Sequence, residues 1–170
     1  MVLMNMNNAP LLSFITVCYN GITDTCGLID SIHKTIHSVS YEIIVVDNAS
    51  WEDEAAIIKA HYPTVITVRN QQNLGFSGGL KIAHGRYLFL INNDTYFESD
   101  GIQALIDRLE SDFQIGAVSP KIRFAFPPQH IQFAGYTQLS SITMRNEPIG
   151  MGYPDDGSFE IPHPSPYLHG

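Results

Sequence analysis

Arg86–Thr95 reads RYLFLINNDT, and this stretch of the chain decides the fold. From Tyr87 onward it is almost wholly apolar, and it then changes abruptly to the polar sequence NNDT at Asn92–Thr95. A continuous apolar run of this length predicts a strand buried on both faces, as in a parallel sheet. The polar residues then follow its carboxyl end, where ligands bind in open α/β sheets. A carboxylate flanked by amides there suits a divalent metal shared with substrate phosphates.

Further strands and helices alternate along the first two thirds of the chain. Apolar, β-branched runs predict strands at Leu11–Val17, Tyr41–Val46, Thr64–Val68 and Ile115–Ser119. Helical spacing predicts a helix from Thr23 with Thr23 or Asp24 as N-cap, a helix from a Ser50–Asp53 capping box to Lys59, a short helix at Leu80–His84, and a helix after Ser99 or Asp100. This order gives βαβ units and an α/β fold with a mostly parallel sheet flanked by helices. After Pro120 the chain is rich in proline, which predicts an irregular C-terminal segment.

The composition limits the class of protein. The 170 residues are 44% hydrophobic and 15% charged, as expected for one globular domain. A formal net charge of −8 argues against a nucleic-acid-binding protein, which needs a basic face. An anionic substrate remains compatible with this charge, because a bound cation reverses the local field.

The first ten residues, MVLMNMNNAP, lack the features of a signal peptide, and no window is long and apolar enough for a transmembrane helix. We therefore expect a cytoplasmic protein, with peripheral attachment to a membrane through other parts of a longer protein left open. The two cysteines, Cys18 and Cys26, are too few for a disulfide framework and are expected to be reduced thiols.

Three polar clusters follow three predicted strands: Cys18–Gly21, Asp47–Ser50 and Asn92–Thr95. Parallel strands end at one edge of their sheet, so the clusters should converge, although a single Asp after a strand is usually only a turn residue. Asp47 is suited to accept hydrogen bonds from a nucleobase or a ribose hydroxyl, Tyr19 to stack on or border a base, and Asp94 to ligate a metal bridging two phosphates.

Other patterns of catalytic or cofactor sites are weak or missing. The loop NLGFSGG at Asn73–Gly79 has glycines that let backbone approach a ligand, and it is also explained as a flexible connection. It is not the GxGxxG of an NAD-binding domain, and the chain has neither a P-loop nor a G-x-S-x-G elbow. His33 and His37 have i, i+4 spacing but no third ligand, so we interpret them as surface or partly packed residues.

Five segments together resemble the family 2 glycosyltransferases of the GT-A fold. They are FITVCYNG (Phe14–Gly21), YEIIVVDNAS (Tyr41–Ser50), NLGFSGG (Asn73–Gly79), YLFLINNDT (Tyr87–Thr95) and IGAVSPKI (Ile115–Ile122), in the order of that family. The likeness is strongest to the branch that includes bacterial rhamnosyltransferases of cell-surface polysaccharide synthesis. It implies a nucleotide-sugar-binding domain at residues 1–125 and, at residues 126–170, an irregular connector toward an acceptor-binding half.

The resemblance also implies a site and a reaction. The donor would be a dTDP-rhamnose or UDP-sugar, the acceptor a glycan or glycolipid, the transfer inverting, and the metal Mg²⁺ or Mn²⁺. Val17, Tyr19 and Asp47 would line the base pocket, and Asn92, Asn93 and Asp94 would form the counterpart of the DxD motif, with Asp94 the direct metal ligand. The other implied donor-binding residues are Asn20, Asn48, Ser50, Gly75, Phe76 and Gly79.

Two departures from the family pattern affect these expectations. After Gly79 the chain is about four residues short of the family's Asn-rich stretch, which removes roughly one helical turn. The sequence also stops at Gly170, where the family continues toward an acidic motif that supplies the catalytic base, so we expect the base to lie beyond Gly170. Asp155 and Asp156 do not match that motif and are interpreted as solvated loop residues. We therefore expect a donor-binding piece of a longer transferase, with weak nucleotide-sugar binding and little turnover on its own.

Two other functions remain as alternatives. One is a non-catalytic sugar-nucleotide-binding or scaffold module that keeps only the outline of the site. The other is a sugar nucleotidyltransferase, which would need a glycine-rich, basic loop after the first strand. The sequence CYNGITD at Cys18–Asp24 has no Lys or Arg, which argues against this second alternative.

Overall fold

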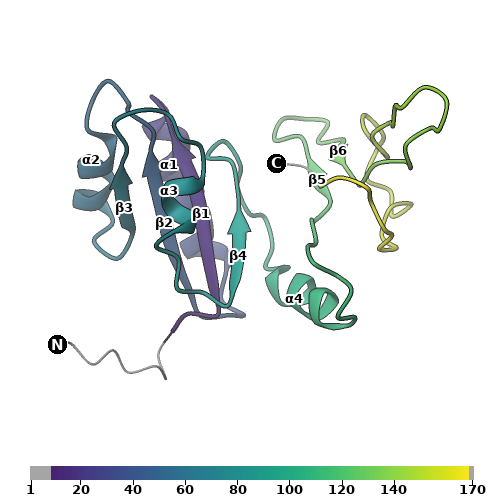
Figure 1. Ribbon diagram of the computed structural model, residues 1–170, viewed down its shortest axis with the longest axis horizontal. Helices are drawn as coiled ribbons and strands as arrows, with labels where there is room; N and C mark the ends of the chain where they lie inside the picture. The colour runs from purple at the N-terminus through teal and green to yellow at the C-terminus, as the bar shows by residue number, and fades with distance from the viewer. Residues whose placement is uncertain (1–8, 169–170) are drawn as a thin grey trace. The chain divides into compact units, whose positions relative to one another are not determined.

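A four-stranded sheet forms the first part of the chain, and all its strands run parallel. The strands are β1 (Leu12–Cys18), β2 (Tyr41–Asp47), β3 (Ile66–Arg69) and β4 (Tyr87–Leu90), in the order β3-β2-β1-β4 (Figure 1). The predicted α/β class with a mostly parallel sheet is therefore confirmed.

The computed structural model describes residues 9–168 and divides into two compact units, the first ending at Gln103 and the second beginning at Ala104. Residues 1–8 lie outside the described residues. The prediction that the first ten residues are not a signal peptide therefore falls mostly on residues that the structure does not describe. Within residues 9–168, none of the helices has the length and apolar character needed to cross a bilayer. The predicted functional boundary at residue 125 stays a prediction.

The end of the predicted connector, His169 and Gly170, also lies outside the described residues. The expectation that the catalytic base is supplied from beyond Gly170 also stays a prediction.

The helices are α1 (Ile22–Thr35), α2 (Glu54–His61), α3 (Ser77–Leu80) and α4 (Ile102–Glu110). The helices α1 and α3 cover opposite faces of the sheet (Figure 1). Thr25 of α1 contacts Cys18 of β1, whereas Gly79 of α3 lies against Ile15, and these two β1 residues point to opposite faces because side chains alternate along a strand. The central strands are therefore covered on both sides.

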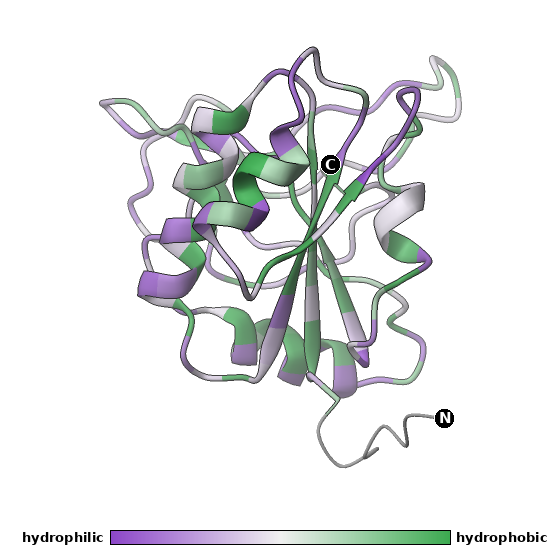
Figure 2. Ribbon diagram, turned by 90° about the vertical axis from the view of Figure 1, so that its left-hand side faces the viewer, coloured by the Kyte–Doolittle hydropathy of each residue, from purple (hydrophilic) through white to green (hydrophobic). Residues whose placement is uncertain are grey.

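The core is built on the two central strands. Ile15, Ile44 and Val46 are buried under α3, with Phe76 packed against them. On the other face the buried side of α1 consists of Thr25, Leu28, Ile29 and Ile32. In Figure 2 the central strands carry long hydrophobic stretches. This packing fixes the strands whose carboxyl ends carry the candidate site.

Three predicted helix starts are wrong in detail. The N-cap of α1 is Gly21 rather than Thr23 or Asp24, and it makes no side-chain cap bond. Asp53, not Ser50, caps α2 by accepting a hydrogen bond from the Ala56 amide, because the Ser50 hydroxyl is used elsewhere. The short helix spans Ser77–Leu80 instead of Leu80–His84, since it is the double-glycine segment that packs closely on the sheet.

The predicted strand at Tyr87–Asn92 is shorter than expected and is not buried on both faces. β4 has β1 as its one neighbour in the sheet, so it is an edge strand, and Leu88 and Leu90 are each 49% exposed. Its other face is covered, because Phe89 contacts Phe14 and Phe97. The strand predicted at Ile115–Ser119 is also absent, and that segment has no regular structure.

The second unit is held by a small antiparallel pair and by ion pairs. β5 (Ile122–Arg123) pairs with β6 (Ile131–Phe133), so the C-terminal segment is less irregular than predicted. Lys121 pairs with Glu160 and, at 2.6 Å, with Asp155. Asp155 and Asp156 are exposed loop residues, as interpreted, but the Asp155 carboxylate is in addition paired with Lys121, which the sequence did not suggest.

Candidate functional site

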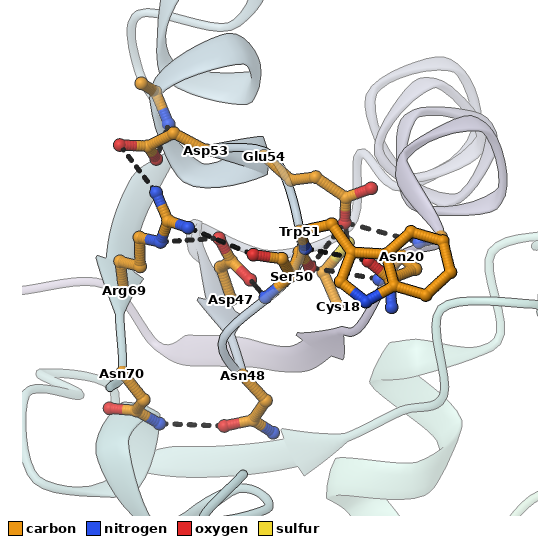
Figure 3. Close-up of polar contacts among 12 residues, drawn as sticks. Cys18, Asn20, Asp47, Asn48, Ser50, Trp51, Asp53, Glu54, Arg69 and Asn70 are labelled. Atoms are coloured by element: carbon orange, nitrogen blue, oxygen red, sulfur yellow. Dashed lines mark hydrogen bonds and ion pairs between the residues drawn. The ribbon is translucent and has the colours of Figure 1, made fainter. Parts of the chain in front are cut away.

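The carboxyl edge of the parallel sheet brings together the polar turns that follow β1 and β2 and the end of β3. The backbone N–H of Asn48 donates to the Cys18 carbonyl at 2.8 Å, and the backbone N–H of Asn70 donates to the Asp47 carbonyl at 2.8 Å. These bonds continue the parallel ladder beyond the strands. Side chains that are far apart in the sequence therefore meet in one layer, shown in Figure 3.

Asp47 is fully buried at the end of β2. Its Oδ1 accepts a hydrogen bond from the Ser50 amide at 2.8 Å, a turn made possible by Ala49 with φ of 66°. Its Oδ2 lies 3.5 Å from Nε of Arg69 and has no hydrogen-bond partner of its own. Arg69 therefore compensates the buried charge only through an ion pair, and one acceptor atom of Asp47 remains unused.

Arg69, the last residue of β3, connects several groups at this edge. Besides Asp47, it contacts Asp53 at 3.1 Å and donates to the Ser50 carbonyl at 3.0 Å. An open hollow of about 510 Å³ beside it is lined by Ala49, Asp53, Arg69, Asn70 and Gln71. The guanidinium thus forms part of the wall of a concave feature at this end of the sheet.

The β1–α1 turn is joined to the β2–α2 loop through Asn20. Its backbone amide donates to Oγ of Ser50 at 2.9 Å, and its side-chain oxygen accepts from the Trp51 amide at 2.9 Å. Asn20 has φ of 53°, a left-handed conformation that Asn tolerates well. Tyr19 and Trp51, on either side of this link, are exposed at 56% and 88%. Val17 is half-buried and packs against the core under α3.

A buried carboxylate, Glu54, lies beneath these two loops. Its Oε2 accepts hydrogen bonds from Sγ of Cys18 at 2.7 Å, Oγ of Ser50 at 2.9 Å and the Gly21 amide at 3.2 Å. Burial, together with the hydrogen bond to Glu54, raises the pKa of Cys18 to about 12. Cys18 is therefore a neutral thiol that donates, and it is free of disulfides as predicted, like Cys26.

Asn48 holds the glycine-rich loop against the sheet. Its Oδ1 accepts from Nδ2 of Asn70 at 2.8 Å and from the Leu74 amide at 3.3 Å, and its Nδ2 donates to the Gly75 carbonyl at 3.2 Å. Gly75 has φ of 59°, where a side chain would be strained. The Asn48 side chain therefore has a structural role that the sequence did not suggest.

The three residues of the NND sequence, Asn92, Asn93 and Asp94, have different surroundings in the structure. Nδ2 of Asn93 donates to the Gly21 carbonyl at 3.2 Å and to Oγ1 of Thr25 at 3.0 Å, which ties the end of β4 to the β1–α1 turn. Asn92 is exposed, and its carbonyl accepts from Thr95. Asp94 is exposed, and among residues 9–168 nothing forms a hydrogen bond or ion pair with its carboxylate. The same residues contain no group of three His, Cys, Asp or Glu side chains able to hold a metal.

The family model for glycosyl transferase family 2 matches residues 13–153 of the 170-residue chain. The chain belongs to this family. The matched residues include all three polar turns, so the layer of side chains described above lies within the part of the chain that the family 2 model covers. No curated protein matches the chain.

Solved structures show the same fold at low sequence identity. TarS 1–349 from S. aureus in complex with UDP has a TM-score of 0.52 and 17% identity, over 68% of this chain and 39% of that one. The mannosyltransferase PcManGT from Pyrobaculum calidifontis, in complex with GDP-Man and Mn²⁺, has a TM-score of 0.51 and 17% identity, over 69% of this chain and 35% of that one. The family 2 chain therefore spans less than two fifths of the length of either.

Two residues of this layer of side chains, Arg69 and Glu54, were missed in the sequence. Arg69 directly follows the predicted strand Thr64–Val68, just as Asp47 follows Tyr41–Val46, so the rule that located the polar turns would have found it if applied to this strand too. Glu54 gave no signal, because an acidic residue in the first turn of a helix is ordinarily explained by the helix dipole. Its three donors come from segments 4 to 36 residues away, which no local pattern records.

Proposed function

We propose that this chain binds the nucleotide-sugar donor of an inverting, metal-assisted glycosyl transfer. The donor would be of the dTDP-rhamnose or UDP-sugar class and the acceptor a glycan or glycolipid. The observation that carries the proposal is Asp47, a fully buried carboxylate at the carboxyl edge of a parallel sheet with one oxygen that lacks a hydrogen-bond partner. Membership of family 2 and the fold shared with proteins crystallised with UDP and with GDP-Man support it.

The proposed base and ribose pocket lies around Asp47. Its unused Oδ2 would accept a hydrogen bond from a nucleobase N–H or a ribose hydroxyl, which a buried acceptor needs. Because Arg69 covers this oxygen, a bound nucleotide must displace or share the guanidinium. Tyr19, exposed on the neighbouring turn, would border the base, and Val17, which packs against the core, would line the same pocket. The backbone at Gly75 would lie beside the donor.

The proposed metal ligand is Asp94. Its exposed, unpaired carboxylate fits an Mg²⁺ or Mn²⁺ ion that takes its remaining ligands from a diphosphate and water, as these ions commonly do in proteins. Such an ion supplies positive charge that offsets the charge developing on the leaving nucleoside diphosphate. Asn92, two residues before Asp94, is also exposed, whereas the amide nitrogen of Asn93 is already used within the protein.

Calorimetric titration with UDP and dTDP, with and without Mn²⁺, tests this proposal. We expect wild type to bind at least one nucleotide more tightly with Mn²⁺, and Asp94→Ala to lose at least tenfold of that affinity. Asp112→Ala is the control, because Asp112 is also an exposed aspartate but belongs to the second unit, where its carboxylate accepts a hydrogen bond from the Gln114 amide at 2.9 Å. Binding that is independent of Mn²⁺, or unchanged in Asp94→Ala, would show that the metal assignment is wrong. No binding to either nucleotide would favour the non-catalytic scaffold.

A further inference from the structure

We propose that Glu54 is a positioning residue of the donor site, a role that rests on the proposed nucleotide binding. Glu54 is only 6% exposed, so its side chain is not itself part of the surface to which a ligand would bind. Its carboxylate instead receives hydrogen bonds from the end of β1, from the β1–α1 turn and from the β2–α2 loop (Figure 3). The turn that carries Tyr19 and the loop that follows Asp47 are thereby joined through one atom, Oε2 of Glu54.

The hydroxyl of Ser50 links Glu54 to the exposed turn after β1 by hydrogen bonds. A serine hydroxyl has one proton, and that proton is donated to Glu54, so the oxygen lone pairs face the Asn20 amide and accept its hydrogen bond. Asn20 in turn accepts from the Trp51 amide. The left-handed backbone of Asn20, the residue that follows Tyr19, is therefore held in place by a relay that begins at Glu54.

Glu54 is suited to this role by its place in the fold. It is the first residue of α2, where the positive end of the helix dipole favours a carboxylate. All three groups that it contacts are donors, so removing the carboxylate leaves each of them without its acceptor in a buried layer. We expect the β1–α1 turn to lose its fixed geometry while the sheet, held by its own ladder, persists.

Glu42, in β2 near the end of that strand opposite to Asp47, provides a matched control. It too is a poorly exposed glutamate that accepts hydrogen bonds from two segments, from Oγ of Ser13 at 2.5 Å and from the His84 amide at 2.6 Å. Glu42→Ala should therefore cost stability of a similar kind without reaching the carboxyl edge. A difference between the two variants separates positioning from general destabilisation.

The experiment compares wild type, Glu54→Ala, Glu54→Gln and Glu42→Ala in two assays. The first measures nucleotide affinity by calorimetry with UDP and dTDP in the presence of Mn²⁺. The second measures hydrogen exchange of the Asn20 and Gly21 amides in the free protein. We expect Glu54→Ala to bind at least tenfold more weakly and to exchange both amides at least tenfold faster. Glu54→Gln, whose amide oxygen still accepts, should restore most of both properties.

The two assays have separate consequences. If wild type binds no nucleotide, the proposed function fails, and the exchange rates alone decide whether Glu54 holds the turn. If amide exchange in Glu54→Ala equals that of wild type, or if Glu42→Ala weakens nucleotide binding as much as Glu54→Ala does, the positioning role is overturned. Should Glu54→Ala not fold, Ser50→Ala removes the relay alone, and unchanged exchange at Asn20 in that variant would overturn the role equally.

Discussion

Replacing Gly79 with alanine tests how closely α3 packs on the sheet beside the candidate site. A Cβ atom at this position would lie 2.5 Å from Cγ2 of Ile15 and 3.0 Å from Cγ2 of Val46. Carbon atoms pack best at about 3.5–4.0 Å, so the helix or the side chains must move by roughly 1 Å. Overpacking of this kind costs about 1–3 kcal/mol. In a chain of this size each kcal/mol lowers Tm by about 2–4 °C, so we expect a fall of about 2–12 °C.

Gly27→Ala is the control for this prediction, because Gly27 lies inside α1 and a Cβ there meets nothing within 4 Å. That variant should gain about 0.5–1 kcal/mol from helix propensity, so the two glycine substitutions should shift Tm in opposite directions. Thermal unfolding followed by circular dichroism measures both. In an Ile15→Ala background, which removes the clashing methyl group, Gly79→Ala should cost less than in wild type. A Gly79→Ala protein as stable as wild type would refute the close packing.

The remaining predictions concern two titratable side chains. Because burial and the bond to Glu54 raise the pKa of Cys18 to about 12, its reaction with a thiol reagent near pH 8 should be on the order of a thousandfold slower than that of an ordinary cysteine. Mass spectrometry of the labelled protein checks this, and labelling of folded Cys18 at the unfolded rate would contradict it. For Glu42, burial opposes ionisation, but hydrogen bonds from Ser13 and His84 outweigh it and hold the pKa below its usual value. The ionised carboxylate therefore stabilises the fold above the unfolded pKa of about 4.3, and this stabilisation is lost as the pH falls through the folded pKa. Urea unfolding should show Glu42→Gln less stable than wild type at neutral pH, with the difference shrinking toward about pH 3, whereas a difference independent of pH would argue against this origin.

The central strands could be predicted from the sequence because a strand buried on both faces is almost continuously apolar. Tyr41–Val46 has strands on either side and helices over both faces, so nearly every position is apolar, and β2 forms where expected. The apolar run at Tyr87–Leu90 gives the same signal, yet β4 lies at the edge with Leu88 and Leu90 half exposed. An apolar run records that a strand forms but not how many neighbours it has.

The helix α3 and the residue Glu54 could not be predicted, and the reasons differ. Gly78 and Gly79 have poor helix propensity, so local preference argues against a helix at Ser77–Leu80. The helix forms there because only a segment without side chains can approach Ile15 and Val46 so closely. Glu54 was missed because its role depends on three partners that the fold, rather than the local sequence, brings to one oxygen.

The polar residues that follow the strands fall into two groups, and this division bears on how the proposed donor site should be tested. Asn48 and Asn93 use their side-chain amides to tie loops together, so their replacement would disturb the site whether or not they touch a ligand. Tyr19 and Asp94 are exposed, and nothing in residues 9–168 holds the Asp94 carboxylate. Substitutions of these two change the ligand-facing surface while leaving the ties between loops intact. An affinity lost in Asp94→Ala therefore reports contact with the ligand, whereas the same loss in an Asn93 variant would report only that the turn after β1 had moved.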